Sequence, residues 1–241
     1  SHSRWLPTKG RGAAKERMAQ DGLIERAREA HRRGELAAAE KLYRQVLAID
    51  PDDPDASHLL GVIHHQRGDY GPALKLIGKA DRLRPDHPAT LNNLGSVLRE
   101  LGRHEEAVQR LNRAIALQPD FAEAQTNLGT VYKKLGRAAD AEAAYRRALA
   151  LNPRDSKALN NLGNLWLEKG AYDAALDWYG RALALAPDAP LTQYNLGSAL
   201  LKMGRIDEAE AALVQALKGE PTMVEALYAL GELYQGQERE D

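Results

Sequence analysis

Residues 91–119 read LNNLGSVLRELGRHEEAVQRLNRAIALQP, and the fold can be deduced from this stretch. Its first half carries leucines at the spacing of one helical face, namely Leu91, Leu94, Leu98 and Leu101. Its second half carries another apolar stripe, at Ala107, Leu111, Ala114 and Ile115. Gly102 separates the two stripes, and Pro119 ends the second because proline cannot continue a helix. The stretch therefore predicts two short antiparallel helices joined by a tight turn.

The same residue types return every 34 residues along the chain. One glycine column consists of Gly61, Gly95, Gly129, Gly163, Gly197 and Gly231. The turn glycines are Gly34, Gly68, Gly102, Gly136, Gly170 and Gly204, and the closing prolines are Pro51, Pro85, Pro119, Pro153, Pro187 and Pro221. With the Asn-Leu-Gly run and the spacing of Ala141, Tyr145 and Ala148, this period resembles the tetratricopeptide repeat family over nearly the whole chain. The resemblance implies an all-α solenoid, an open right-handed superhelix of antiparallel helix pairs.

The period also predicts the domain organisation. Residues 1–19 form a basic leader with five Lys or Arg against one Glu. We expect the leader to be a linker without order of its own, or to dock Trp5-Leu6-Pro7 into a groove of the same or a neighbouring molecule. Residues 20–241 form the repeat domain, with units at about 20–53, 54–87, 88–121, 122–155, 156–189 and 190–223, and a single helix at 224–236.

Helix starts are marked in several of these units. Pro54, Pro88 and Pro190 suit the first turn of a helix, and Asp53 can cap the helix that follows it. After the single helix at 224–236 no partner helix follows. This helix is either a lid over the sixth repeat or, as its apolar side chains favour, the start of a repeat cut from a longer protein.

Composition excludes several kinds of partner. The 33 Lys plus Arg balance 34 Asp plus Glu, so no overall field gathers nucleic acid or anionic lipid. The absence of cysteine excludes disulfides and thiol chemistry. No apolar run approaches the roughly 18 residues of a membrane span, and the first twenty residues lack a signal-peptide core. We expect a cytoplasmic protein that binds neither nucleic acid nor membrane.

Catalytic and cofactor motifs are missing from the sequence. It contains no HExxH, GxGxxG or GxxxxGK motif, and His58, His64 and His65 are expected at the surface or in the groove. The aromatic residues Tyr132, Tyr145, Trp166 and Tyr179 stand at packing intervals and are expected in the core. We therefore expect no catalytic residue, no metal and no cofactor, and the chain is not expected to be an enzyme.

One polar column is not explained by packing. Four asparagines stand 34 residues apart, each directly before the packing leucine: Asn93, Asn127, Asn161 and Asn195. Asparagine inside a helix costs about half a kcal/mol relative to alanine, so we expect a compensating role. First helices of such a stack line its concave side, and a primary amide can bond both the N–H and the C=O of another backbone. Helices about 8–10 Å apart would place one amide at roughly every third residue of an extended peptide.

This column resembles the asparagine ladder in the repeat superhelix of O-linked N-acetylglucosamine transferases. By that resemblance the four asparagines clamp an extended peptide backbone, with Ser96, Thr130, Asn164 and Ser198 lining the same groove. Asn92 and Asn160 complete the predicted site. The alternative, that these asparagines bond only to the adjacent unit, stays open. A family subgroup grips terminal carboxylates with paired Lys and Asn, but Asn92, Thr126, Asn160 and Tyr194 include no lysine, which excludes that clamp.

The expected function is a protein interaction module that binds an extended or disordered protein segment in its concave groove. The resemblance implies that it recruits substrates for a larger bacterial-type glycosyltransferase or sulfotransferase. The alternative is a structural adaptor that assembles a complex through its convex faces or ends. The leader and the open C-terminal end are candidate surfaces for self-association.

Overall fold

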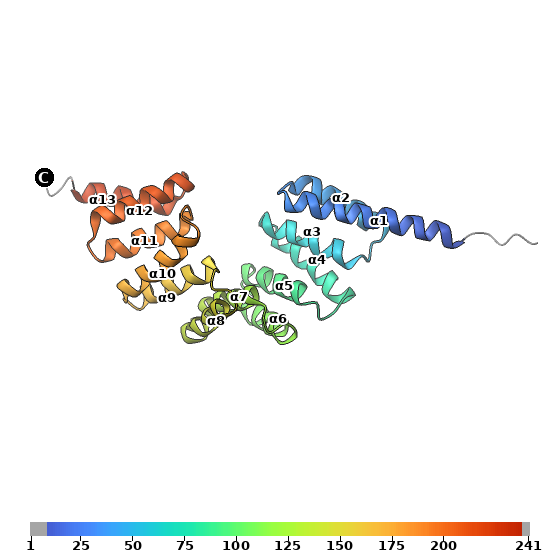
Figure 1. The fold of residues 1–241 in the computed structure, drawn as a ribbon, viewed down its shortest axis with the longest axis horizontal. Helices are drawn as coiled ribbons and strands as arrows, with labels where there is room; N and C mark the ends of the chain where they lie inside the picture. The colour runs from blue at the N-terminus through green and yellow to red at the C-terminus, as the bar shows by residue number, and fades with distance from the viewer. Residues whose placement is uncertain (1–8, 238–241) are drawn as a thin grey trace, which may run out of the picture. The chain divides into compact units, whose positions relative to one another are not determined.

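The computed structural model describes the backbone of residues 9–237 and the side chains of residues 20–235. In that part the chain forms thirteen α-helices and no strand, which confirms the all-α prediction (Figure 1). The helices are α1 Lys9–Arg32, α2 Leu36–Ile49, α3 Pro54–Gln66, α4 Tyr70–Leu83, α5 Pro88–Glu100, α6 His104–Leu117, α7 Ala122–Lys134, α8 Ala138–Leu151, α9 Ser156–Glu168, α10 Tyr172–Leu185, α11 Pro190–Lys202, α12 Ile206–Gly219 and α13 Val224–Gln237. Among these helices none is both long and apolar enough to cross a membrane.

The N-terminal leader lies only partly within this range. The backbone of α1 begins at Lys9, so this helix enters the range assigned to the leader. Trp5, Leu6 and Pro7, for which we expect docking into a groove, lie outside the described residues.

The chain divides into two units, residues 1–119 and 120–241. In the first unit α1 pairs with α2, α3 with α4, and α5 with α6; in the second α7 pairs with α8, α9 with α10, and α11 with α12. Each second helix also packs on the next first helix within its unit, and successive first helices touch, as in α7 with α9 and α9 with α11. Helix α13 packs on α12 and α11. Contacts confined to neighbouring elements are those of an α-solenoid.

The turn between paired helices depends on a glycine in the left-handed region. After α5, Gly102 has φ +73°, which side chains other than glycine adopt at a cost. The Arg103 N–H donates to the Leu98 carbonyl at 2.9 Å, and the Gly102 N–H donates to the Arg99 carbonyl at 3.0 Å, so the last turn is satisfied. Leu101 was predicted on the same helical face as Leu91, Leu94 and Leu98, but it follows the end of α5 and is 39% exposed, so it does not continue that stripe.

The predicted helix starts are confirmed at three repeats. Proline occupies the first turn of α3, α5 and α11. Asp53 caps α3, because its Oδ1 accepts the backbone N–H of Ala56 at 2.7 Å. Each of these signals satisfies or removes a backbone donor that the first turn of a helix leaves without a partner.

The second glycine column brings paired helices into close contact. A Cβ added to Gly129 of α7 would lie 2.6 Å from Cε1 of Tyr145 in α8, and one added to Gly95 of α5 would lie 2.6 Å from Cγ of Leu111 in α6. Tyr145 and Leu111 are fully buried at these contacts. Gly231 in α13 is the exception, because nothing within 4 Å would meet its added Cβ. The glycine is therefore required where a second helix presses a large side chain on the first.

We predict that Gly129→Ala lowers the free energy of unfolding by about 1–3 kcal/mol, because the added methyl group overpacks the buried Tyr145 ring. The matched control is Gly231→Ala, which meets no neighbour and should be neutral or stabilising by about 0.5–1 kcal/mol through helix propensity. Urea unfolding followed by circular dichroism measures both. Equal effects of the two substitutions would contradict the packing explanation.

Candidate functional site

The four column asparagines lie on first helices of successive pairs: Asn93 on α5, Asn127 on α7, Asn161 on α9 and Asn195 on α11. All four are partly buried. Asn93 Nδ2 lies 2.8 Å from His58 Nε2, and Asn195 Nδ2 donates to Asn160 Oδ1 at 3.0 Å. Asn161 Nδ2 donates to Thr130 Oγ1 at a longer 3.4 Å, and Asn127 is partnered as well. Bonding to the preceding repeat therefore accounts for part of the role of this column.

These contacts leave hydrogen-bonding capacity on the amides. A primary amide has two N–H donors and an oxygen with two lone pairs. Asn93, Asn161 and Asn195 each use one N–H toward the preceding repeat. Within residues 20–235 their amide oxygens accept no hydrogen bond. Asn93, Asn161 and Asn195 are thus partly buried side chains that keep an acceptor for a further partner.

One member of the column lines a surface hollow of the second unit. Asn127 and Thr126 of α7 face the loop before α9 across a hollow of about 340 Å³. Thr126 Oγ1 donates to Asp155 Oδ2 at 2.7 Å, and Asp155 also caps α9. The remaining lining is polar and carries both signs of charge: Glu123, Asn152, Arg154, Ser156 and Lys157. Asn127 therefore belongs to a surface that a polar chain can approach.

The predicted groove neighbours are largely occupied by the scaffold. Tyr145 Oη donates to Thr130 Oγ1 at 3.3 Å, and Tyr179 Oη donates to Asn164 Oδ1 at 2.7 Å. Sequence reasoning missed these pairs, although the signal was present. Where the second helix carries a tyrosine at this position, the residue 15 positions earlier is Thr130 or Asn164, which accepts its hydrogen bond. Where the second helix carries a leucine at this position, the residue 15 positions earlier is Ser96 or Ser198.

The other predicted site residues differ in their exposure. Ser96 is buried, and Ser198 is partly buried. Asn92 and Asn160 are 2% and 6% exposed, too little for an amide to reach a partner in this conformation.

His58 is more buried than the sequence indicated. It was expected at the surface or in the groove, but it is 6% exposed and takes part in the bond to Asn93. Because Asn93 Nδ2 is the donor, His58 Nε2 accepts and the ring is neutral. Burial, with a smaller contribution from His87, lowers the pKa of His58 to about 4. The ring of His87 lies edge-on to it at 6.3 Å.

We predict that the free energy of unfolding falls as pH drops from about 6.5 to about 4. In this range His58 is protonated in the unfolded chain but stays neutral in the folded chain, so acid favours unfolding. A pKa difference of this size corresponds to at most roughly 3 kcal/mol. Urea unfolding at both ends of this range should show a weaker pH dependence for His58→Gln, which keeps a polar side chain. Identical pH dependence in the two proteins would show that His58 is not the group responsible.

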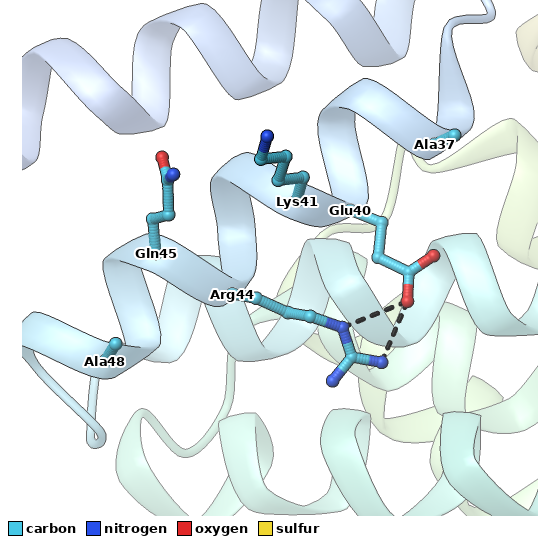
Figure 2. A pocket seen from close by; sticks show the side chains of 6 residues that line it. All are labelled: Ala37, Glu40, Lys41, Arg44, Gln45 and Ala48. Carbon is cyan, nitrogen blue, oxygen red and sulfur yellow. Dashed lines mark hydrogen bonds and ion pairs between the residues drawn. The ribbon is translucent and has the colours of Figure 1, made fainter.

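A further hollow, of about 440 Å³, lies along α2 (Figure 2). Its described lining comes from this helix alone: Ala37, Glu40, Lys41, Arg44, Gln45 and Ala48. Figure 2 shows the Arg44 guanidinium paired with Glu40, through bonds of 3.0 and 2.8 Å. Glu40 also pairs with Arg67, which follows α3, and such surface ion pairs do not suggest a catalytic or cofactor site. Among the described residues no cluster of His, Asp and Glu could hold a metal ion.

Comparison with known proteins supports the repeat assignment. Models of the tetratricopeptide repeat match residues 95–136, 126–190 and 166–221. A model of anaphase-promoting complex (cyclosome) subunit 3 matches residues 32–114. No curated protein sequence matches the chain significantly.

Solved structures share the fold. PilF of Pseudomonas aeruginosa has a TM-score of 0.73 at 24% identity, over 90% of this chain and 99% of that one. PilW, a type IV pilus biogenesis factor, has a TM-score of 0.77 at 21% identity, over 88% and 98%. A thermophilic repeat protein of Thermus thermophilus has a TM-score of 0.65 at 27% identity, over 76% and 99%. Sequence period, helix pairing and these matches agree, and the chain belongs to the tetratricopeptide repeat superfamily.

Proposed function

We propose that this chain is a protein interaction module that binds an extended peptide segment along its first helices. In the second unit the side-chain amides of Asn127, Asn161 and Asn195 bond the backbone of the bound segment, and Asn93 presents the same group on the first unit. The observation that carries the proposal is that Asn93, Asn161 and Asn195 each use one N–H to fix the orientation of the amide on the preceding repeat. An amide held in this way is preorganised for a ligand, which lowers the entropic cost of binding.

The second unit provides the spacing that such a ligand needs. Helices α7, α9 and α11 lie next to one another, and each carries its asparagine at the same helical position. Packed helices are about 8–10 Å apart and an extended chain advances about 3.3 Å per residue, so one peptide N–H in three meets an amide. Recognition through the backbone tolerates many side-chain sequences. This suits a partner segment that is disordered when free.

Similar proteins support partner binding in place of catalysis. The family matched at residues 32–114 is a subunit of the anaphase-promoting complex, and PilW is a biogenesis factor of the type IV pilus. The resemblance of the asparagine column to O-linked N-acetylglucosamine transferases leads us to propose further that the module recruits substrates for a larger transferase. That extension depends on the column alone.

We predict that Asn127→Ala combined with Asn161→Ala weakens binding of peptides selected from a displayed library of unstructured sequences by more than about tenfold, since each lost hydrogen bond contributes about 1 kcal/mol. The melting temperature should fall by no more than a few degrees, because the bond from Asn161 to the scaffold is long at 3.4 Å and Asn127, although it has a partner, is only partly buried. The matched control is Asn112→Ala, an exposed asparagine on the second helix α6.

Two outcomes would contradict the groove proposal. Undiminished peptide binding by the double variant would show that the amides are not contacts. A large loss of stability would show instead that the amides hold the repeats together.

Helix α13 supports a second candidate function, that of an assembly adaptor. Val224, Leu227 and Tyr228 are 71%, 49% and 66% exposed, and Tyr234 is exposed on the same helix. In α11 the equivalent glycine face is covered by α12, where Gly197 meets Leu213. The open face of α13 therefore resembles a repeat surface without its cover, and a second protein could supply one.

We predict that the chain self-associates at high concentration if α13 is such an assembly surface, and that Val224→Lys with Tyr228→Lys abolishes the association. Sedimentation velocity over a concentration series measures it. The control is Asn112→Lys on the exposed face of α6, which should leave association unchanged. A chain that stays monomeric throughout the series would contradict self-association through this face.

A further inference from the structure

The second unit contains a hollow that involves neither the asparagine column nor α13. Its volume is about 640 Å³, and its described lining comes from α10, α11 and α12. Leu176 of α10 and Leu196 of α11 are partly exposed there, and Ala211 of α12 is exposed. An apolar group from outside can therefore reach all three side chains.

The preceding repeat fills the equivalent place with a side chain of its own. Trp178 of α10 stands 34 residues before Ala212 of α12, which lines the hollow. The Trp178 ring packs on a buried cluster that includes Leu162, and Leu162 is the counterpart of Leu196. Where α10 has an indole ring, α12 has only a methyl group. The hollow therefore lies where the covering indole of the preceding repeat has no counterpart.

A cation accompanies that indole in the preceding repeat. The Arg181 guanidinium lies over the Trp178 ring, 4.3 Å from its centroid, which is the geometry of a cation–π contact. The counterpart of Arg181 in α12 is Gln215, which also lines the hollow. The α12 repeat thus lacks both members of the stacked pair.

The charges at the hollow favour a ligand that brings a cation. Arg205 and Glu208 pair with each other at 2.6 Å. Asp177 is exposed, and among the described side chains it forms no ion pair or hydrogen bond. An arginine suits this carboxylate better than a lysine, because a guanidinium both stacks on an indole and bonds a carboxylate at two points.

We propose that this hollow binds a tryptophan of a partner protein that carries an arginine beside it. The indole contacts Leu176, Leu196 and Ala211, and the arginine pairs with Asp177. The partner supplies from outside the pair that Trp178 and Arg181 supply within the preceding repeat. Tryptophan and arginine are the side chains that most often anchor a protein interface in a small pocket.

The experiment uses the full chain labelled with ¹⁵N and three Gly-Ser peptides with blocked ends, at constant ionic strength. Their central residues are Arg-Trp, Gln-Trp and Arg-Ala. We expect saturable shifts of the Ala211 and Gln215 amide signals with the Arg-Trp peptide, and an affinity about two- to fivefold lower for the Gln-Trp peptide. Equal shifts with the Arg-Ala peptide, or no shifts with any peptide, would overturn the proposal. Equal affinities of the Arg-Trp and Gln-Trp peptides would overturn the pairing with Asp177.

The leader of this chain is the competing occupant, because it contains Arg4-Trp5. A peptide of residues 1–19 is therefore titrated in the same way. Tighter binding of this peptide than of the Arg-Trp peptide, reversed by Trp5→Ala, would overturn the assignment to a partner protein.

Two variants of the chain test the named groups. Asp177→Asn changes an exposed side chain, so the fold should be kept while the affinity for the Arg-Trp peptide falls to that of the Gln-Trp peptide. Ala212→Trp with Gln215→Arg recreates the stacked pair of α10 inside α12, so peptide binding should be lost while the melting temperature is kept or raised. Undiminished binding by both variants would overturn the site.

Controls separate this site from the other proposed surfaces. Asp120→Asn removes another exposed carboxylate of the same unit and should leave the affinity unchanged. The Asn127→Ala, Asn161→Ala protein and the Val224→Lys, Tyr228→Lys protein should also bind the Arg-Trp peptide normally, whether or not they have lost library peptides or self-association. Loss of binding in any of these controls would contradict the assignment to the hollow.

Discussion

The contact between a bare helix backbone and a large side chain of its partner helix is the constraint on which the structure depends. At Gly95 and Gly129 the second helix presses Leu111 or Tyr145 against the first, where a Cβ would collide. In the four repeats that carry it, the asparagine stands two residues before that glycine, about 200° around the helix at 100° per residue. Packing the glycine inward therefore turns the asparagine outward, and the same contact that builds the solenoid positions its polar column.

Polar groups between the helices follow the same repeat, and their variations are informative. Where a second helix brings a tyrosine, the first helix supplies Thr130 or Asn164 as acceptor. Asn93, Asn161 and Asn195 each use one amide N–H toward the preceding repeat. The first repeat departs from the pattern, since Arg28 replaces the acceptor and Leu59 replaces the asparagine.

Most of the fold could be predicted because its determinants are local. Turn glycines, first-turn prolines and apolar spacing act within a few residues, and repetition confirms each of them several times. The prediction was wrong at Leu101, which lies past the last turn of α5, where the helical spacing no longer applies. The pairs His58–Asn93 and Asn160–Asn195 each join residues 35 positions apart. Such contacts depend on how successive repeats are rotated against each other, which the sequence does not specify locally. The tyrosine pairs could have been predicted from the sequence, because the same 15-residue separation occurs in two repeats, between Thr130 and Tyr145 and between Asn164 and Tyr179.

Backbone recognition by the asparagine column is the central claim, and N-methylation of a bound peptide tests it most directly. A peptide selected on the chain is resynthesised with one amide N-methylated at a time, which removes the N–H and leaves every side chain in place. The account predicts that affinity collapses at about every third position and changes little elsewhere, whereas alanine substitution of the peptide side chains is tolerated. Uniform tolerance of N-methylation, together with sharp losses on alanine substitution, would contradict it.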